Sequence, residues 1–165
     1  MKFKGCNLLC FIAFIAFIIN AISCNDPRIY DKYQNVSLQG WNRRDTLTFD
    51  IPRQWEGRYL LFLGIRTAKN FPYRNLSVIV NEQIISVKGR KRTIRYSNCN
   101  IIRCKIVNKK GQIIGHENIS NNTIRSYIKS FYLKRNDSIH ITINHNMNED
   151  VLQGVSNIGI TLIKQ

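Results

Sequence analysis

Apolar and polar residues alternate with a period of two through much of the chain, which predicts β-strands with one buried face. In residues 138–143, for example, Ile139, Ile141 and Ile143 fall on one face and the polar residues fall on the other. Residues 58–67 are continuously apolar in their middle, as expected for a central strand covered on both sides. The segments with strand patterns are 46–51, 58–67, 75–82, 84–87, 93–96, 100–107, 138–143 and 158–163.

Two segments do not follow this alternation clearly. Residues 125–133 fit helical spacing as well as a strand, and their aromatic and β-branched content favours the strand. Residues 148–152 suggest a short helical turn. Turn residues at regular spacing between eight or nine short strands predict an all-β fold, a two-sheet antiparallel β-sandwich of jelly-roll-like type. We expect a single domain over residues 36–165.

The first residues have a different pattern, which indicates an export signal. Lys2 and Lys4 precede a 12-residue apolar run, Leu8–Ile19. That run is too short to span roughly 30 Å of bilayer hydrocarbon as a stable anchor, so cleavage is expected. Ala21-Ile22-Ser23-Cys24 resembles a bacterial lipobox, in which the cysteine is acylated and becomes the mature N-terminus. The alternative is an ordinary signal cleaved after Ser23, with Cys24 as a free thiol.

Lipidation of Cys24 would divide the chain into three parts. Residues 1–23 form the signal peptide, residues 24–35 a polar acylated tether, and residues 36–165 the sandwich. Acyl chains contribute about 0.8 kcal/mol per buried CH₂, so two or three of them anchor the protein permanently. The mature protein then lies outside the cytoplasm, and its folded part needs no membrane-binding surface to stay attached.

Cysteine chemistry is limited in the remaining domain, because Cys6 and Cys10 leave with the signal. Cys99 and Cys104 lie five positions apart in a strand-like segment, so their side chains point to opposite faces. Two separate thiols are therefore favoured over a disulfide. No second pair of cysteines or histidines has the spacing of metal ligands, and we expect neither a metal nor another cofactor.

The chain is strongly basic, with 25 Lys and Arg against 10 Asp and Glu residues. The basic residues concentrate at Lys88–Arg92 and Arg95. Outside the cytoplasm such charge points to acidic lipids or glycans rather than to nucleic acid. The alternative is that this run is a solvated loop or edge strand, where charge prevents edge-to-edge pairing.

The sequence contains no recognisable catalytic motif. His140 and His145 differ by an odd number and so point to opposite faces of a strand, and His116 lies in a polar loop. Neither a nucleophile elbow, an HExxH motif nor a phosphate-binding glycine loop is present. We therefore expect a protein that is not an enzyme.

Aromatic residues leave a binding function open. Trp41 stands beside Arg43 and Arg44, and we expect these three residues to form a surface that contacts a glycan or a protein partner. Trp55 is expected to plug an end of the sandwich instead. Two triplets, Asp45-Thr46-Leu47 and Asp137-Ser138-Ile139, resemble the pattern that Bacteroidota use for O-glycosylation, which makes Thr46 and Ser138 candidate sites.

An ordered set of motifs resembles the gliding-motility-associated lipoprotein H family of Bacteroidota, GldH. That family typically shows a Tyr-Asp-x-Tyr start, a Trp before an Asp-x-hydrophobic-x-Phe strand, a strand ending in Arg, and a Tyr-Pro-Tyr-x-Asn-Leu segment. The segments that resemble it are Tyr30–Tyr33, Trp41 with Arg44–Phe49, Tyr59–Arg66, Phe71–Leu76, Gly111–Gly115, Met147 and Leu152–Ile160.

The resemblance implies an accessory lipoprotein of the gliding machinery, linked to the type IX secretion apparatus, with no assigned biochemical activity. It favours a non-catalytic protein that contacts other envelope proteins while acyl chains on Cys24 hold it in a membrane. The alternative is a glycan-binding surface lipoprotein. Asn25-Asp26 is not the acidic run that promotes surface export in this phylum, so a periplasm-facing position is favoured.

Overall fold

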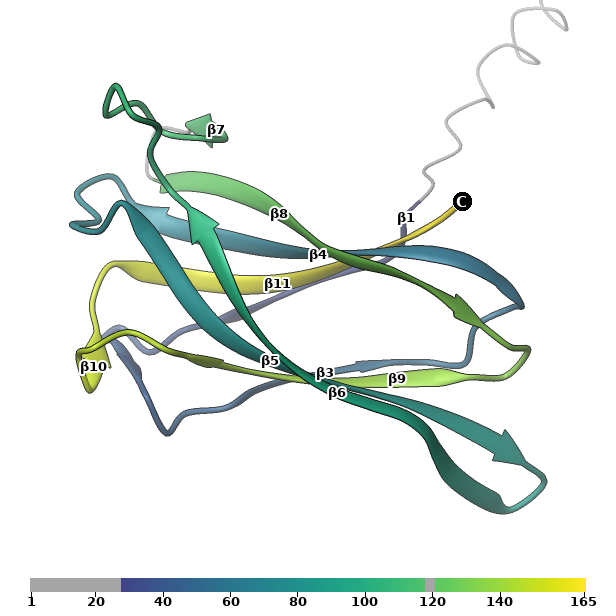
Figure 1. Ribbon diagram of the computed structural model, residues 1–165. Helices are drawn as coiled ribbons and strands as arrows, with labels where there is room; N and C mark the ends of the chain where they lie inside the picture. Colours follow the sequence, from purple (N-terminus) through teal and green to yellow (C-terminus); the bar gives the residue numbers. More distant parts are fainter. Residues whose placement is uncertain (1–27, 118–120) are drawn as a thin grey trace, which may run out of the picture.

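The computed structural model describes residues 28–117 and 121–165 as two antiparallel sheets packed face to face (Figure 1). One sheet has the strand order β1-β11-β4-β8-β7 and the other the order β3-β9-β5-β6, and β10 pairs with β2. The strands are β1 (Arg28–Asn35), β2 (Trp41–Asn42), β3 (Leu47–Ile51), β4 (Gly57–Ala68), β5 (Asn75–Lys88), β6 (Lys91–Lys105), β7 (His116–Glu117), β8 (Asn121–Leu133), β9 (Ser138–His145), β10 (Val151–Leu152) and β11 (Val155–Lys164).

The topology confirms the predicted jelly-roll-like sandwich. The eight longer strands are split between two four-stranded layers, and the chain changes layer between all successive long strands except β5 and β6. Eight strands in two sheets, joined by two Greek-key connections, define a double-sheet jelly roll. Residues 125–133 lie within β8, so the strand predicted there is confirmed.

The core follows from the period-two pattern. Along β9 every second residue is buried, and Ile141 and Ile143 are completely enclosed. The apolar middle of β4 contributes Leu61, Leu63 and Ile65 to the same core, where each is fully buried. Burial of such side chains is worth roughly 1.5–3 kcal/mol each, which makes the interface between the sheets the main source of stability.

Two glycines allow β1 to pack closely on its own sheet. Tyr33 pairs with Gly159 of β11, which pairs with Gly64 of β4, so the tyrosine ring lies across two residues without side chains. A Cβ atom at Gly159 would lie 2.5 Å from Cδ1 of Tyr33. The Arg66 guanidinium also lies over this ring, 4.2 Å from its centroid.

Two boundaries differ from the sequence-based expectation. Arg28–Asn35, predicted as part of a tether, is paired with β11 along its length, because Tyr30 points into the core while its polar neighbours face solvent. The predicted turn of helix at 148–152 is instead bent chain followed by the two-residue strand β10, whose partner is β2. The partner strands, β11 for β1 and β2 for β10, are distant in sequence, so the local composition of the two segments does not reveal them.

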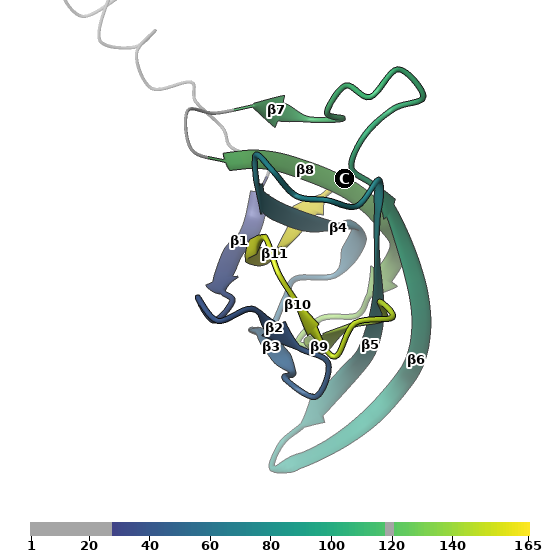
Figure 2. The same cartoon turned by 90° about the vertical axis from the view of Figure 1, so that its left-hand side faces the viewer.

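The sandwich has two ends, which we name by their residues. The Arg28 end contains the start of β1, the end of β11, loops 52–56 and 134–137, and the tip of the β5–β6 hairpin (Figure 1). The Trp41 end contains β2, β10, loop 69–74 and segment 146–150. Figure 2 looks onto the Trp41 end, where β10 and β2 lie in front of the space between the sheets.

Candidate functional site

An open cleft of about 880 Å³ lies at the Trp41 end. The start of β5, the second half of β6 and the segment before β10 form its walls. The side chains that give the cleft its chemistry are Arg43, Tyr73, Arg74, Ile101, Arg103 and Glu149.

Arg43 holds one wall of the cleft in place. Its Nη2 donates to the backbone oxygens of Met147 at 2.5 Å, Asn148 at 2.6 Å and Glu149 at 3.2 Å. Its Nε also lies 3.8 Å from Asp150. A planar guanidinium suits such a set of acceptors, so Arg43 mainly shapes the cleft.

Tyr73 and Glu149 form the acidic side of the cleft. The Tyr73 hydroxyl donates a hydrogen bond to the Glu149 carboxylate, which raises the pKa of Tyr73 and lowers the pKa of Glu149. The ring of Tyr73 packs edge-on against Phe71, with 5.5 Å between centroids. The lowered pKa keeps the carboxylate ionised at neutral pH, and its buried Oε2 has no hydrogen-bond partner among the described residues.

Positive charge and apolar surface remain on the opposite side. Arg74 donates to the Asn108 carbonyl oxygen at 2.7 Å, whereas Arg103 has no ion-pair partner within the described part of the chain. Ile101, two residues before it on the same face of β6, is 65% exposed. Such a cleft fits a partner that presents a carboxylate beside an apolar side chain.

The prediction for Trp41 is wrong. Trp41 is 1% exposed, its Nε1 donates to the Asp45 carbonyl oxygen at 3.1 Å, and its ring meets His145 edge-on at 5.4 Å. Pairing of β2 with β10 covers the end of the sandwich and turns the indole inward. Arg43 and Arg44 are exposed, but the Trp41 indole does not lie beside them on the surface. Trp55, expected to be the plug, is 67% exposed instead.

The two candidate glycosylation sites have different surroundings. Thr46 is exposed beside the exposed Asp45, and its hydroxyl accepts a hydrogen bond from Asn144 at 2.8 Å. Ser138 is partly buried and donates to the Ile85 carbonyl oxygen at 3.4 Å, next to the fully buried Asp137. Only the Thr46 triplet is accessible as a unit in the folded protein.

The cysteines and histidines do not form a joint site within the described residues. Cys99 is exposed, Cys104 is buried with its pKa raised by burial, and both are free thiols. His140 Nδ1 lies 2.7 Å from Asp50 on the outer face of its sheet, whereas His145 is buried. No group of three or more potential metal ligands occurs in 28–117 or 121–165.

Sequence reasoning did not identify a buried ion pair between the sheets. Glu82 of β5 is 3% exposed and accepts a hydrogen bond from Lys129 Nζ of β8 at 2.7 Å, and Tyr96 lies 3.0 Å from the same Nζ. Burial by itself would lower the pKa of Lys129, but the contacts with Glu82 and Tyr96 outweigh it and raise that pKa. Glu82 alternates with the inward-facing Val78 and Val80, and this spacing could have predicted a buried carboxylate that needs a partner.

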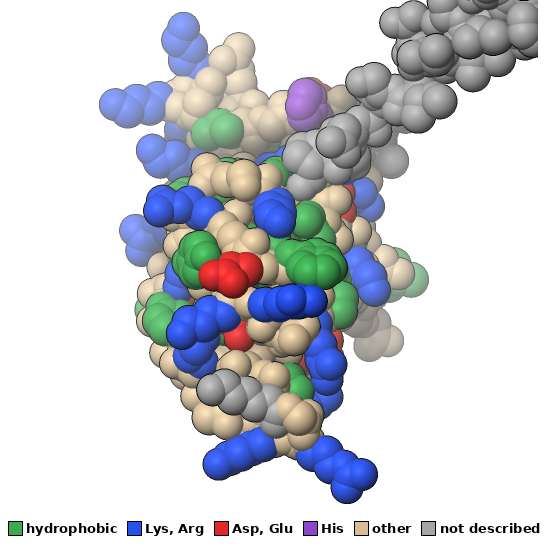
Figure 3. Space-filling model, turned by 90° about the vertical axis from the view of Figure 1, so that its right-hand side faces the viewer, with side chains coloured by type: hydrophobic (Ala, Val, Ile, Leu, Met, Phe, Trp, Pro, Cys, Tyr) green, Lys and Arg blue, Asp and Glu red, His purple; other side chains and the backbone are tan. Residues whose placement is uncertain are grey.

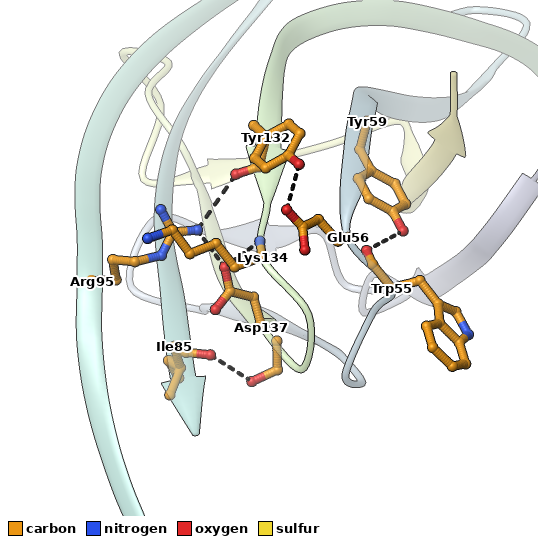
Figure 4. Close-up of polar contacts among 9 residues, drawn as sticks. Trp55, Glu56, Tyr59, Ile85, Arg95, Tyr132, Lys134 and Asp137 are labelled. Carbon is orange, nitrogen blue, oxygen red and sulfur yellow. Dashed lines mark hydrogen bonds and ion pairs between the residues drawn. The ribbon is translucent and has the colours of Figure 1, made fainter. Parts of the chain in front are cut away.

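A second buried carboxylate organises the Arg28 end (Figure 4). Asp137 is fully buried, accepts the backbone N–H of Lys134 at 2.9 Å and forms an ion pair with Arg95 of β6. Arg95 also lies 3.4 Å from the Tyr132 carbonyl oxygen. Asn136 supplies the left-handed backbone that this turn requires, with φ of 69°. The contacts join the β8–β9 turn to the edge strand β6.

Fold and cleft define a class of protein: a jelly-roll β-sandwich with an open cleft at one end, lined by Arg43, Arg74 and Arg103 among others. The chain belongs to the GldH lipoprotein family, which matches residues 28–162. It is 30% identical over 101 residues to the gliding motility lipoprotein GldH of Flavobacterium johnsoniae, a match that covers 61% of this chain and 60% of that protein. The aligned region therefore spans less than two thirds of that relative.

A solved structure resembles the chain in fold alone. The crystal structure of a protein from Sulfurospirillum deleyianum has a TM-score of 0.50 and 6% sequence identity, and the match covers 82% of this chain and 98% of the other. Within residues 28–117 and 121–165, no helix has the length and apolar character needed to cross a membrane.

Proposed function

We propose that the protein is a lipid-anchored, non-catalytic component of the gliding machinery in a Bacteroidota envelope, where it acts by binding another envelope protein. One observation carries the proposal. Residues from two separate segments that resemble the family, Tyr73 and Arg74 from one and Met147 from the other, gather with Arg43 around a single cleft. A shared cleft built by family motifs is a natural place for partner contact.

The chemistry of the cleft suggests the partner. Arg74 and Arg103 face solvent near the exposed Ile101, whereas the Glu149 carboxylate is engaged by Tyr73. An acidic, partly apolar segment of an envelope protein would complement this surface. A binding role is also consistent with the scattered histidines and thiols, which do not form a nucleophile-and-base arrangement within the described residues.

The anchor is proposed at Cys24, which lies outside the described residues. Palmitate and related acyl chains on this residue would hold the domain at a periplasm-facing membrane surface. Intact-mass measurement of protein from its native host tests the anchor, and a species that starts at Cys24 with added lipid mass is expected. Added glycan mass in the same spectrum would indicate O-glycosylation, for which we propose Thr46 before Ser138 because Asp45 and Thr46 are both exposed.

Charge reversal in the cleft tests the binding function. In the native host, Arg74→Glu with Arg103→Glu should weaken capture of envelope partners by roughly tenfold or more, because like charges would face each other. Colony spreading should fall with it. Lys109→Glu with Lys110→Glu makes the same charge change in the exposed turn outside this cleft and is the matched control. Equal capture by both variants would contradict the proposed role of the cleft.

The glycan-binding alternative loses its main candidate residue. A sugar stacks on an exposed aromatic face, and the Trp41 indole is buried under β10. Saturable binding to envelope glycans by the acylated protein would restore this alternative, whereas stable capture of proteins supports the proposal.

A further inference from the structure

The Arg28 end carries a dense set of exposed basic side chains. They come from loop 52–56 and the following β4, loop 134–137, the β5–β6 hairpin and the end of β11, which are distant in sequence. Figure 3 looks onto this end and shows blue Lys and Arg side chains around a small apolar and acidic centre. The exposed basic residues are Arg53, Arg58, Arg90, Lys91, Arg92, Lys134, Arg135 and Lys164.

The two loops at this end contribute only two carboxylates against these cations. Asp137 is fully buried and engaged by Arg95, and Glu56 accepts a hydrogen bond from Tyr132 at 2.6 Å. Ion pairs occur at both ends of the sandwich. Arg28 lies 2.7 Å from Asp31 at the start of β1, and at the Trp41 end Lys69 lies 3.5 Å from Glu117 and Arg43 lies 3.8 Å from Asp150. The exposed cations of the Arg28 end therefore outnumber the carboxylates of its two loops by eight to two.

An exposed tryptophan lies among these cations. The Trp55 carbonyl oxygen accepts the Tyr59 hydroxyl at 2.8 Å, which fixes the backbone, while the indole points away from the polar contacts into solvent (Figure 4). Arg135 lies 5.1 Å from its ring centroid. Tryptophan beside Lys and Arg is typical of the interface between lipid headgroups and water.

The position of the proposed anchor points to the same end. Only three residues separate Cys24 from Arg28, the first residue of β1. Fully extended, the chain from Cys24 to Arg28 spans at most about 14 Å. The 12-residue strand β4 runs between the ends of the sandwich over roughly 40 Å. An acyl group on Cys24 thus keeps the Arg28 end near the bilayer.

We propose that the Arg28 end docks on anionic phospholipid headgroups, with Trp55 inserted at the interface. This inference rests on the lipid anchor of the proposed function and adds the orientation of the domain. The acyl chains attach the protein, and the basic end restricts its rotation. The cleft at the opposite end then faces away from the membrane, where an envelope protein can reach it.

Tryptophan quenching by brominated phospholipids tests the docking in the full acylated protein. The vesicles contain phosphatidylethanolamine with phosphatidylglycerol, and phosphatidylcholine vesicles serve as the neutral reference. Bromine on the acyl chains quenches an indole only near the bilayer, so Trp55 should be quenched on anionic vesicles and Trp41 should not. Trp55→Phe should abolish the quenching.

Matched charge variants distinguish electrostatic docking by the Arg28 end from nonspecific attraction of any exposed cation to anionic vesicles. Each cation near an anionic surface favours the docked state by roughly fivefold, so Arg53→Gln, Arg58→Gln and Lys164→Gln together should lower the docked-to-free ratio by about 100-fold. The control Lys105→Gln, Lys109→Gln and Lys110→Gln removes three exposed cations near the Trp41 end and should leave the quenching unchanged.

Two results would overturn the docking. Acylated, vesicle-bound protein whose Trp55 is not quenched would contradict it while leaving the proposed function intact. Equal quenching on neutral and anionic vesicles would contradict its electrostatic basis. An unacylated Cys24 by intact mass would instead overturn the anchor and the docking together, so the two failures are distinguishable.

Discussion

At the scale of single residues, the ion pair between Glu82 and Lys129 joins the two sheets through a buried carboxylate. One Glu82 oxygen has no hydrogen-bond partner in the described residues, so the carboxylate depends on Lys129 for compensation. Lys129→Met should destabilise the fold by about 3–5 kcal/mol, because it leaves a buried charge unpaired. Glu82→Gln with Lys129→Met should recover most of that loss. Urea unfolding of the single and double variants provides the measurement, and additive losses would contradict the coupling.

His145 should make stability depend on mildly acidic pH. Burial against Trp41 lowers its pKa, and the folded state therefore binds a proton less readily than the unfolded state does. The free energy of unfolding should be fully developed above the unfolded pKa of about 6.5 and should fall as pH drops below it. Thermal unfolding should show a shallower acid decline in His145→Phe. The exposed His116→Gln is the control, and an identical slope in both variants would refute the assignment.

At the scale of elements, the contact between β1 and its sheet depends on the missing side chains of Gly64 and Gly159. Gly159→Ala would place a Cβ within 2.7 Å of three ring atoms of Tyr33. The resulting overpacking should cost about 1–3 kcal/mol of stability. Tyr33→Ala should relieve the clash, so the double variant should lose less than the sum of the two single losses. A fully additive result would mean that the ring does not lie over the glycine pair.

The same contact gives a physical reason for part of the family pattern. The Tyr-Asp-x-Tyr start, the glycine in Leu63-Gly64-Ile65-Arg66 and the glycine in Ile158-Gly159-Ile160 are far apart in sequence. In the fold, Tyr33, Gly64, Gly159 and Arg66 form one packed unit. The unit attaches the edge strand β1 to the sheet and so places the chain leading to Cys24 at the Arg28 end.

At the scale of the whole molecule, the short connection between anchor and sandwich should control orientation. Insertion of 20 Gly and Ser residues after Asp26 adds a flexible spacer with a root-mean-square length of about 25 Å. The local concentration of the Arg28 end at the headgroups should fall, and Trp55 quenching should fall with it. Flotation with vesicles should persist because the acyl chains remain. Unchanged quenching would show that docking does not require the short connection.

Much of the fold was predictable because burial in a sandwich follows alternation within each strand. Ile139, Ile141 and Ile143 face inward as their spacing predicts, and the opposite faces of Cys99 and Cys104 are confirmed by their exposure. The predicted exposures of the two tryptophans were wrong: Trp41 was expected at the surface and is buried, and Trp55 was expected to be buried and is exposed. Local sequence gave no indication that β10 would cover Trp41 or that loop 52–56 would turn Trp55 outward.

The sequence by itself determined the strand-rich pattern, the inward-facing residues and the motifs of the family, since these depend on residues a few positions apart. Tertiary structure alone decided which segments meet: Arg43 with residues 147–149, Glu82 with Lys129, and Asp137 with Arg95. It also brought exposed basic residues from distant segments together at the Arg28 end. Those arrangements depend on pairing between distant strands, and their order is fixed by the packing of the whole sandwich.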